Sequence, residues 1–248
     1  MIIELRDVNN KEVFFSYYDL EKGKKIFESI QMEEKYWIGI EALCGDLIIF
    51  HKYAKPDMPG HKELIAFDVS EQKVRWINSD FSFLFAYQDK IYCYKQNFES
   101  RNFYSLNYMN GRIEENLGED FEKVNLLRAE ADRLKSAGEY LFPEKYDEAT
   151  ADPIVKQLIN GELRGLEIVG DVEYNRRGNL LFFNFYSKVF SGSLVNRFNA
   201  FNLSVNKKVL SELLNSNTNA FVPDSFFIYK NFLLLLKEKN GLIVYKLD

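Results

Sequence analysis

The sequence has few cysteines, and its first residues do not have the pattern of a secretory leader. Cys44 and Cys93 are the only two in 248 residues. Both lie in apolar, strand-like segments with no CxxC partner, so we expect buried free thiols and neither a disulfide nor a metal pair. No basic region followed by a continuous apolar stretch stands at the N-terminus, so no signal peptide is expected. A cytoplasmic protein is the resulting prediction.

Long apolar runs and an excess of basic residues are also absent. The longest apolar runs, such as residues 232–236, are too short to cross a bilayer, so we expect no membrane partner. The chain has 32 basic and 37 acidic residues, a net charge of −5. This balance does not favour binding to a nucleic-acid backbone. With 46% hydrophobic residues, the composition is that of a folded globular protein and excludes a disordered chain.

What the sequence does contain is a recurring hairpin unit. The unit is an apolar strand, an Asp or Asn near its end, a polar turn with Lys or Arg, and a second strand, as in LIAFDVSEQKVRWI. Copies span residues 14–30, 64–77, 103–117 and 198–213, and LIVYKLD from Leu242 begins a fifth. A further pair of β-rich runs precedes each copy after the first. Runs bounded by Asn, Asp and Gly at such spacing are repeated hairpin signals.

The spacing of these units predicts a β-propeller. The marker positions 19, 68, 107, 202 and 246 are 49, 39, 95 and 44 residues apart. Periods of about 40–50 residues with strand signals are typical of propeller blades, and the doubled interval indicates a missing or degenerate copy. We therefore expect one mainly β, propeller-like domain over residues 1–248, with five or six blade units. In it, the first strand and LIVYKLD complete one blade. An irregular β sandwich with the same hairpins is the alternative fold.

The hairpins also resemble a known repeat. The order strand, Asp68, polar turn, second strand and Trp76 is similar to the blade repeats of quinoprotein-type β-propellers, although Ser70-Glu71-Gln72 stands where those repeats typically carry Thr-Gly. The whole chain resembles small uncharacterised bacterial propeller-like proteins. This resemblance implies a propeller fold, and it transfers no activity and no functional residue. Asp68, Trp76 and Trp37 are accordingly interpreted as structural.

A helical insertion around residues 119–161 interrupts the strand signal. Apolar residues between Phe121 and Ala137 recur at steps of three and four, which indicates an amphipathic helix. A second helix is predicted with Asp152 as its N-cap, Pro153 in its first turn and Gly161 as its end. We expect the insertion to plug a gap or cover an edge strand, or else to dock a partner.

Motifs for catalysis and for cofactors are missing. GxSxG, GxxxxGK[ST], HExxH and GxGxxG do not occur, so no catalytic residue and no cofactor is expected. The stretch from His51 to Glu63 holds both histidines, His51 and His61, together with Asp57. The His-x9-His spacing matches no dependable metal pattern, and the stretch also carries lysines that would repel a cation. We expect a surface loop that contacts a ligand and holds no metal.

The candidate binding face consists of the connections between the second and third strands of the blades. Three of these connections, 51–63, 96–102 and 187–196, look longer than the hairpin turns on the opposite side. Loops on a rigid scaffold commonly carry binding residues. The predicted binding residues are His51, Asp57, His61, Arg101, Asn102, Ser187, Lys188, Asn196 and Arg197.

The function predicted from these observations is that of a non-enzymatic intracellular binding module for a partner protein or a small ligand. The alternative is a hydrolase or other enzyme that acts on a carbohydrate or a phosphorylated metabolite. Fold analogy alone supports that alternative, because propellers host hydrolases with scattered polar residues.

Overall fold

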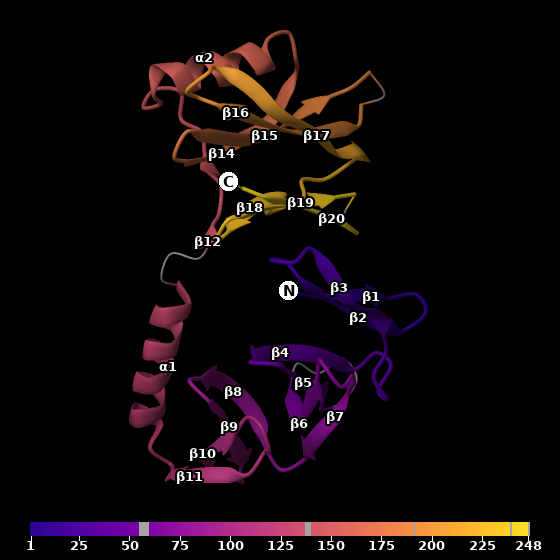
Figure 1. Cartoon of the computed structure of the whole chain (residues 1–248), viewed down its shortest axis with the longest axis vertical. Helices are drawn as coiled ribbons and strands as arrows, with labels where there is room; N and C mark the ends of the chain where they lie inside the picture. The colour runs from indigo at the N-terminus through magenta and orange to yellow at the C-terminus, as the bar shows by residue number, and fades with distance from the viewer. Residues whose placement is uncertain (55–59, 137–139, 191, 239, 248) are drawn as a thin grey trace. The chain divides into compact units, whose positions relative to one another are not determined.

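The fold consists of antiparallel β-sheets. The computed structural model of the chain describes residues 1–54, 60–136, 140–190, 192–238 and 240–247. Within them, twenty strands and two helices are present, and the strands form five sheets (Figure 1). The chain divides into two compact units, residues 1–137 and 138–248. The mainly β prediction is confirmed, and the expectation of one domain over the whole chain stays a prediction.

The first unit contains three sheets in chain order. Sheet 1 consists of β1 (Ile2–Asp7), β2 (Glu12–Asp19) and β3 (Lys24–Ile30). Sheet 2 consists of β4 (Ile38–Cys44), β5 (Leu47–Tyr53), β6 (His61–Asp68) and β7 (Lys73–Asn78). Sheet 3 consists of β8 (Ser82–Tyr87), β9 (Lys90–Gln96), β10 (Arg101–Asn107) and β11 (Ile113–Gly118). Each sheet is a meander, because neighbouring strands follow one another in sequence.

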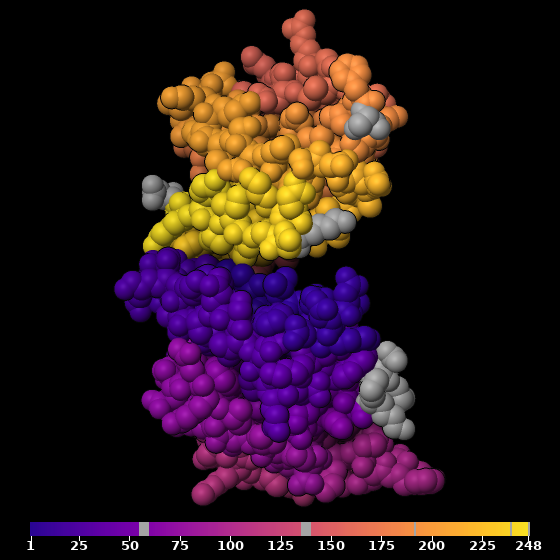
Figure 2. Space-filling model, turned by 90° about the vertical axis from the view of Figure 1, so that its right-hand side faces the viewer, coloured from indigo at the N-terminus to yellow at the C-terminus, as the bar shows by residue number. Residues whose placement is uncertain are grey.

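The side chains of β5 point alternately to the two faces of sheet 2 and contribute to a buried hydrophobic cluster on each face. Ile48 and Phe50 are fully buried in the cluster shared with sheet 1. Leu47 and Ile49 are fully buried in the cluster shared with sheet 3. Successive side chains of a strand point to opposite faces, so one strand can serve two interfaces. The space-filling view shows the first sheet, in indigo, packed against the purple strands of the second (Figure 2).

The repeated Asp or Asn of the hairpins closes the turn that follows it. Asp68 Oδ1 accepts hydrogen bonds from the backbone N–H groups of Ser70 and Glu71, both at 3.0 Å. Asp19, Asn107 and Asn202 accept in the same way from a backbone N–H two or three residues further on. The backbone hydrogen bond from Glu71 contributes most to lowering the pKa of Asp68 below its usual value. The markers are therefore structural, as the sequence predicted.

The second unit contains two sheets and takes short edge strands from the inserted segment. Sheet 4 consists of β13 (Glu144–Lys145), β14 (Ile168–Arg177), β15 (Leu180–Lys188), β16 (Leu194–Asn202) and β17 (Lys207–Thr218). Sheet 5 consists of β12 (Tyr140–Leu141), β18 (Phe226–Tyr229), β19 (Phe232–Lys237) and β20 (Gly241–Lys246). Buried phenylalanines such as Phe198 and Phe226 pack between the two sheets.

The predicted helical insertion is present. Helix α1 (Phe121–Ser136) packs on sheet 3 through Val124 and Ala131, and α2 (Pro153–Leu163) packs on sheet 4 through Val155 and Ile159. Strands β12 and β13 pair with β18 and β14, so the segment covers two sheet edges.

The predicted start of α2 is correct and its predicted end is wrong. The Asp152 side chain accepts from the N–H of Ile154, and Pro153 opens the helix, as expected. Gly161 lies inside the helix, which continues to Leu163. Gly165, with φ +77°, follows the true end and takes up the left-handed conformation there.

The predicted blade that joins the two chain ends stays a prediction, because the two ends belong to different units. Strand β1 pairs with β2 in sheet 1, and β20 pairs with β19 in sheet 5. The fourth strand of sheet 5 is β12, which comes from the inserted segment. The sequence pattern identified which residues form strands. It did not indicate which strands the short, exposed ones such as β12 pair with.

Both cysteines are buried, as predicted. Burial raises the pKa of Cys93 to about 12. This thiol therefore stays protonated near neutral pH.

Candidate metal centre

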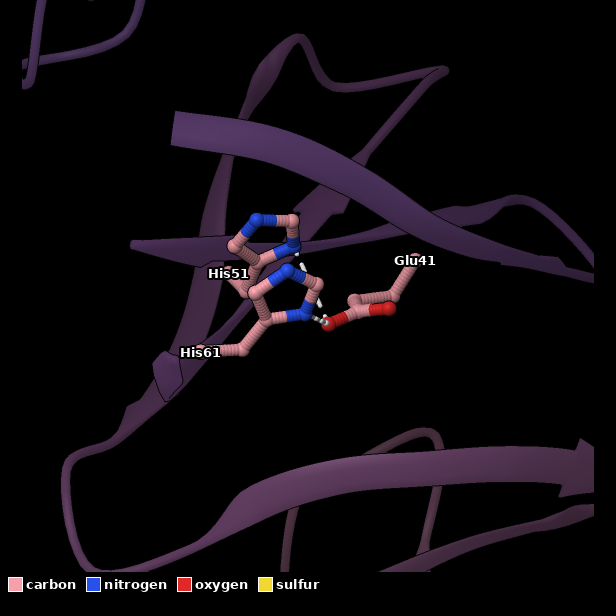
Figure 3. A group of neighbouring side chains, drawn as sticks. All are labelled: Glu41, His51 and His61. Atoms are coloured by element: carbon pink, nitrogen blue, oxygen red, sulfur yellow. Dashed lines mark hydrogen bonds and ion pairs between the residues drawn. The ribbon is translucent and has the colours of Figure 1, made fainter. Parts of the chain in front are cut away.

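Three neighbouring strands of sheet 2 bring one acid and both histidines together. Glu41 lies on β4, His51 on β5 and His61 at the start of β6. Each offers one donor atom, and these atoms lie within 4.8 Å of one another. Figure 3 shows both imidazoles turned toward the Glu41 carboxylate. His51 follows Leu47 and Ile49 in the alternation of β5, so the cluster lies on the face of sheet 2 that packs against sheet 3.

A β-bulge and a glycine shape this end of the sheet. Ile40 pairs with Phe50 and Ala42 pairs with Ile49, so Glu41 is an extra residue without a partner across the ladder. Bulges redirect side chains and are frequent beside functional sites. Gly39 pairs directly with His51, and a Cβ at Gly39 would lie 2.9 Å from His51 Cε1. The glycine therefore leaves the space that the imidazole occupies.

The two imidazole rings are stacked face to face, and the Nδ1 atoms of both lie near the same carboxylate oxygen of Glu41. Their centroids are 3.6 Å apart, with an interplanar angle of 8°. Glu41 Oε1 lies 2.7 Å from His61 Nδ1 and 3.0 Å from His51 Nδ1. The ring of Tyr53 meets both imidazoles edge-on, at 4.9 and 5.5 Å. Three donor atoms thus converge on a small volume with an aromatic wall.

His51 is a buried side chain whose polar atoms lack hydrogen bonds. Its relative exposure is 4%, and within the described residues neither ring nitrogen has a hydrogen-bond partner. The 3.0 Å contact with Glu41 is an ion-pair distance without the alignment of a hydrogen bond. Burying such a group without a partner costs on the order of 1–3 kcal/mol. Unlike an ordinary core histidine, this one keeps its donor atoms free.

The lysine beside the site does not present the free charge that the sequence led us to expect. Lys52 Nζ forms an ion pair with Glu63 Oε1 at 2.6 Å, so its charge is compensated. Lys62 is exposed and extends into solvent. Lys55 lies outside the described residues, as does Asp57 among the predicted binding residues.

The donor set suits a divalent transition-metal ion. Two imidazoles and one carboxylate are the ligands of several zinc sites and of non-haem iron sites, with bonds of about 2.0–2.2 Å for zinc. Ligand atoms of a tetrahedral zinc site lie about 3.4 Å apart at such bond lengths. The observed separations of 2.7 and 3.0 Å would lengthen by less than about 1 Å, within the reach of small side-chain rotations.

The other predicted binding residues of the first unit lie elsewhere. Arg101 and Asn102 begin β10 in sheet 3. Arg101 donates from Nε to Gln96 Oε1 at 2.9 Å, and its guanidinium lies over the ring of Tyr94. Within the described residues, no hydrogen bond or ion pair joins either residue to the histidines. Of the predicted residues that the structure describes, His51 and His61 meet in one cluster.

The predicted binding residues of the second unit lie in strands and not in a long loop. Strand β15 extends through Ser187 and Lys188, and β16 already includes Asn196 and Arg197. Ser187 is buried, whereas Lys188 is exposed and forms a 3.8 Å ion pair with Glu167. The connection is therefore confined to residues 189–193, and apolar alternation alone overestimated its length.

Asn196 belongs to a buried polar network inside the second unit. Its Nδ2 donates to Ser225 Oγ at 2.9 Å, and its Oδ1 accepts from Asn184 Nδ2 at 3.2 Å. Burial raises the pKa of the nearby Glu173, while a hydrogen bond from Asn184 opposes this shift. The network satisfies most of its own polar atoms, which is typical of a structural role.

Asn196→Ala is expected to lower the free energy of unfolding by about 2–3 kcal/mol, because the buried side chains of Asn184 and Ser225 each lose one hydrogen bond. Urea unfolding followed by circular dichroism measures the loss. Asn217→Ala, an exposed position on β17, is the control and should change stability by less than about 0.5 kcal/mol. Equal effects of the two substitutions would contradict a structural network.

Sequence reasoning missed Glu41 and Gly39 at the metal cluster. The segment YWIGIEALC belongs to the pair of β-rich runs before the second hairpin copy, but a bulge has no signature in apolar alternation. Two signals were available: a glycine inside a strand indicates a bulge or a close approach, and an acid interrupts an otherwise apolar run. Both lie ten or more residues before the histidines, so a search along the chain for ligand spacing could not join them.

The fold and the site together define a mainly β protein of antiparallel sheets with a His–Glu–His cluster. Residues 1–76 match the model of a family described as a domain of unknown function, DUF4905. This match includes all three cluster residues. No curated protein matches the chain.

The chain has distant similarities to solved structures. The chain is similar to Hsv2 of Kluyveromyces lactis with its complete loop 6CD, at 12% identity and a TM-score of 0.28, over 98% of this chain and 72% of that one. It is also similar to a bifunctional GH43-CE protein of Bacteroides eggerthii, at 11% identity and a TM-score of 0.23, over 98% of this chain and 32% of that one. The resemblance of the hairpins to quinoprotein-type repeats stays a prediction. Within the described residues, no helix has the length and apolar character to span a bilayer.

Proposed function

We propose that the chain is a propeller-like, non-enzymatic binding module whose ligand is a divalent transition-metal ion held by Glu41, His51 and His61. The observation that carries the proposal is the buried His51 ring, which has no hydrogen-bond partner among the described residues and faces two further donors. In place of the single misaligned contact with Glu41, a metal ion would give the Nδ1 atom of His51 a bond. The free energy of that bond offsets the cost of burying the imidazole.

The arrangement of the sheets supports the propeller-like part of the proposal. Four of the five sheets contain four or more strands. Each of these four includes, at the predicted residues, the repeated hairpin or the pair of strands that precedes it. In each unit, adjacent sheets pack face to face through buried clusters. Blades of a propeller bury their faces in this manner, because a four-stranded sheet alone leaves both faces exposed. The proposed compartment is the cytoplasm. The hydrolase alternative stays a prediction.

Zinc titration of the full chain tests the metal proposal. Calorimetry is expected to show binding of one Zn²⁺ per chain, and zinc at 100 times its Kd should raise the free energy of unfolding by about 2.7 kcal/mol. Glu41→Gln and His61→Ala should each weaken binding by more than roughly 100-fold, since even the loss of a residue that only orients a ligand costs about 10–100-fold.

The matched control is Glu71→Gln, which removes an exposed carboxylate from the turn of the same sheet. It should bind zinc like the unmodified chain. Co²⁺ absorption gives a second readout, because its visible bands report the geometry of nitrogen and oxygen ligands. If zinc stabilises the His61→Ala variant as much as the parent chain, or does not bind the parent at all, the proposal is rejected.

A further inference from the structure

A groove in the first unit, separate from the metal cluster, has the features of a small-molecule site. It lies between sheet 3 and the N-terminal half of α1 and encloses about 220 Å³. Its floor is formed by Phe85, Phe103 and Val124, which are 3%, 9% and 4% exposed. Phe121, at 58% exposure, forms a wall that is open to solvent. A cavity of about 150 Å³ is enough to hold a benzene ring, so the groove accommodates one aromatic ring with a substituent.

Two arginines from different elements line the same groove. Arg101 comes from the first position of β10, and Arg128 comes from α1. Within the described residues, no acidic side chain lines the groove. The groove therefore presents two positive charges beside an apolar floor.

Arg101 is fixed in place by neutral groups. Its Nε donates to Gln96 Oε1 at 2.9 Å, and its guanidinium carbon lies 4.6 Å from the centre of the Tyr94 ring. These contacts orient the planar group and leave its charge uncompensated, and its terminal nitrogens have no partner within the described residues. Guanidinium binds carboxylate and phosphate groups through two parallel hydrogen bonds. A guanidinium that is already oriented loses less conformational entropy when it binds an anion.

Arg128 has a weak acidic partner. Its Nε lies 4.0 Å from Asp132 Oδ2, which is the limit of an ion pair, and both side chains are more than half exposed. Such an exposed pair contributes about 0–1 kcal/mol, so an incoming anion can compete with it.

We infer that this groove binds a small anionic ligand that has an aromatic ring on Phe85, Phe103 and Val124 and a carboxylate or phosphate group between Arg101 and Arg128. The ring would replace water on the apolar floor, and the anionic group would compensate both guanidinium charges. This inference does not depend on the metal site, because the two sites share no residue.

Ligand-detected NMR on the full chain tests the inference with three probes of similar size: phenylacetate, phenyl phosphate and the neutral benzyl alcohol. At least one acid is expected to bind with a Kd of about 1 mM or tighter, and benzyl alcohol is expected to bind at least tenfold more weakly than that acid. The comparison of the two acids identifies which anionic group the arginines prefer.

Variants then test the two arginines. Arg101→Gln and Arg128→Gln should each weaken binding of the preferred acid by roughly 10- to 100-fold, the range for a hydrogen bond to a charged group. Arg112→Gln removes an exposed positive charge from the turn between β10 and β11 and should have no effect. Unchanged thermal midpoints establish that these surface variants remain folded.

Three results would overturn the inference: neither acid binds the unmodified chain, benzyl alcohol binds as tightly as the acids, or the arginine variants bind the acids like the Arg112→Gln control. A negative result in these ligand-binding experiments would not affect the zinc titration, so the two proposals are tested independently.

Discussion

Phe50→Ala is expected to lower the free energy of unfolding of the first unit by about 3–5 kcal/mol, the range for removal of a buried phenylalanine ring. Phe50 is fully buried between sheets 1 and 2. Its ring meets Phe15 edge-on at 4.7 Å and Phe67 at 6.4 Å. The substitution therefore leaves a cavity in the middle of an aromatic cluster, and β-strands that pair on both sides of β5 cannot collapse to fill it.

Denaturant unfolding measures this loss. Phe98→Ala is the matched control, because Phe98 is 99% exposed, and its truncation should change stability by less than about 0.5 kcal/mol. A loss from Phe50→Ala as small as that of the control would show that sheets 1 and 2 do not share this core.

The same variant separates stability from metal binding. Phe50 and His51 are consecutive on β5, so their side chains point to opposite faces of sheet 2. Where Phe50→Ala is still folded, zinc should stabilise it by the same increment as it stabilises the unmodified chain. A loss of this increment would mean that the cluster depends on the opposite face of the sheet.

The sequence was informative where structure follows from local alternation. The hairpins with Asp19, Asp68, Asn107 and Asn202 lie at the predicted residues, because each marker closes its own turn within two or three residues. The start of α2 was predictable for the same reason, since Asp152 bonds only two residues ahead.

Pairing over a long sequence distance was not predictable. Strand β12 is two residues long and exposed, and it joins β18 from almost ninety positions away. Nothing in its composition indicates that partner. The candidate site shows the same limit. His51 and His61 were identified by residue type, but their third ligand, Glu41, comes from a strand whose bulge is defined only by pairing.

Gly39 gives the most specific test of this geometry. A methyl group at this position would lie 2.9 Å from His51 Cε1 and 3.2 Å from its Nε2. The imidazole has little room to move away, because it is 4% exposed and stacked on His61 at 3.6 Å. Gly39→Ala is therefore expected to lower the free energy of unfolding by about 1–3 kcal/mol, the usual cost of overpacking. It should also weaken zinc binding by more than about tenfold, because the displaced ring no longer presents its nitrogen to Glu41 and His61.

A double-mutant cycle with His51→Ala isolates the cause. Where the imidazole is absent, the added methyl group has free space, so Gly39→Ala should cost little in the His51→Ala background. The difference between the two backgrounds is expected to exceed about 1 kcal/mol, which is typical of residues in direct contact. An equal cost in both backgrounds would mean that the glycine serves the backbone of β4 and not the histidine. The loss of zinc binding in Gly39→Ala would then need another explanation. Strong coupling would instead show that the glycine, the bulge and the buried imidazole act together in metal binding.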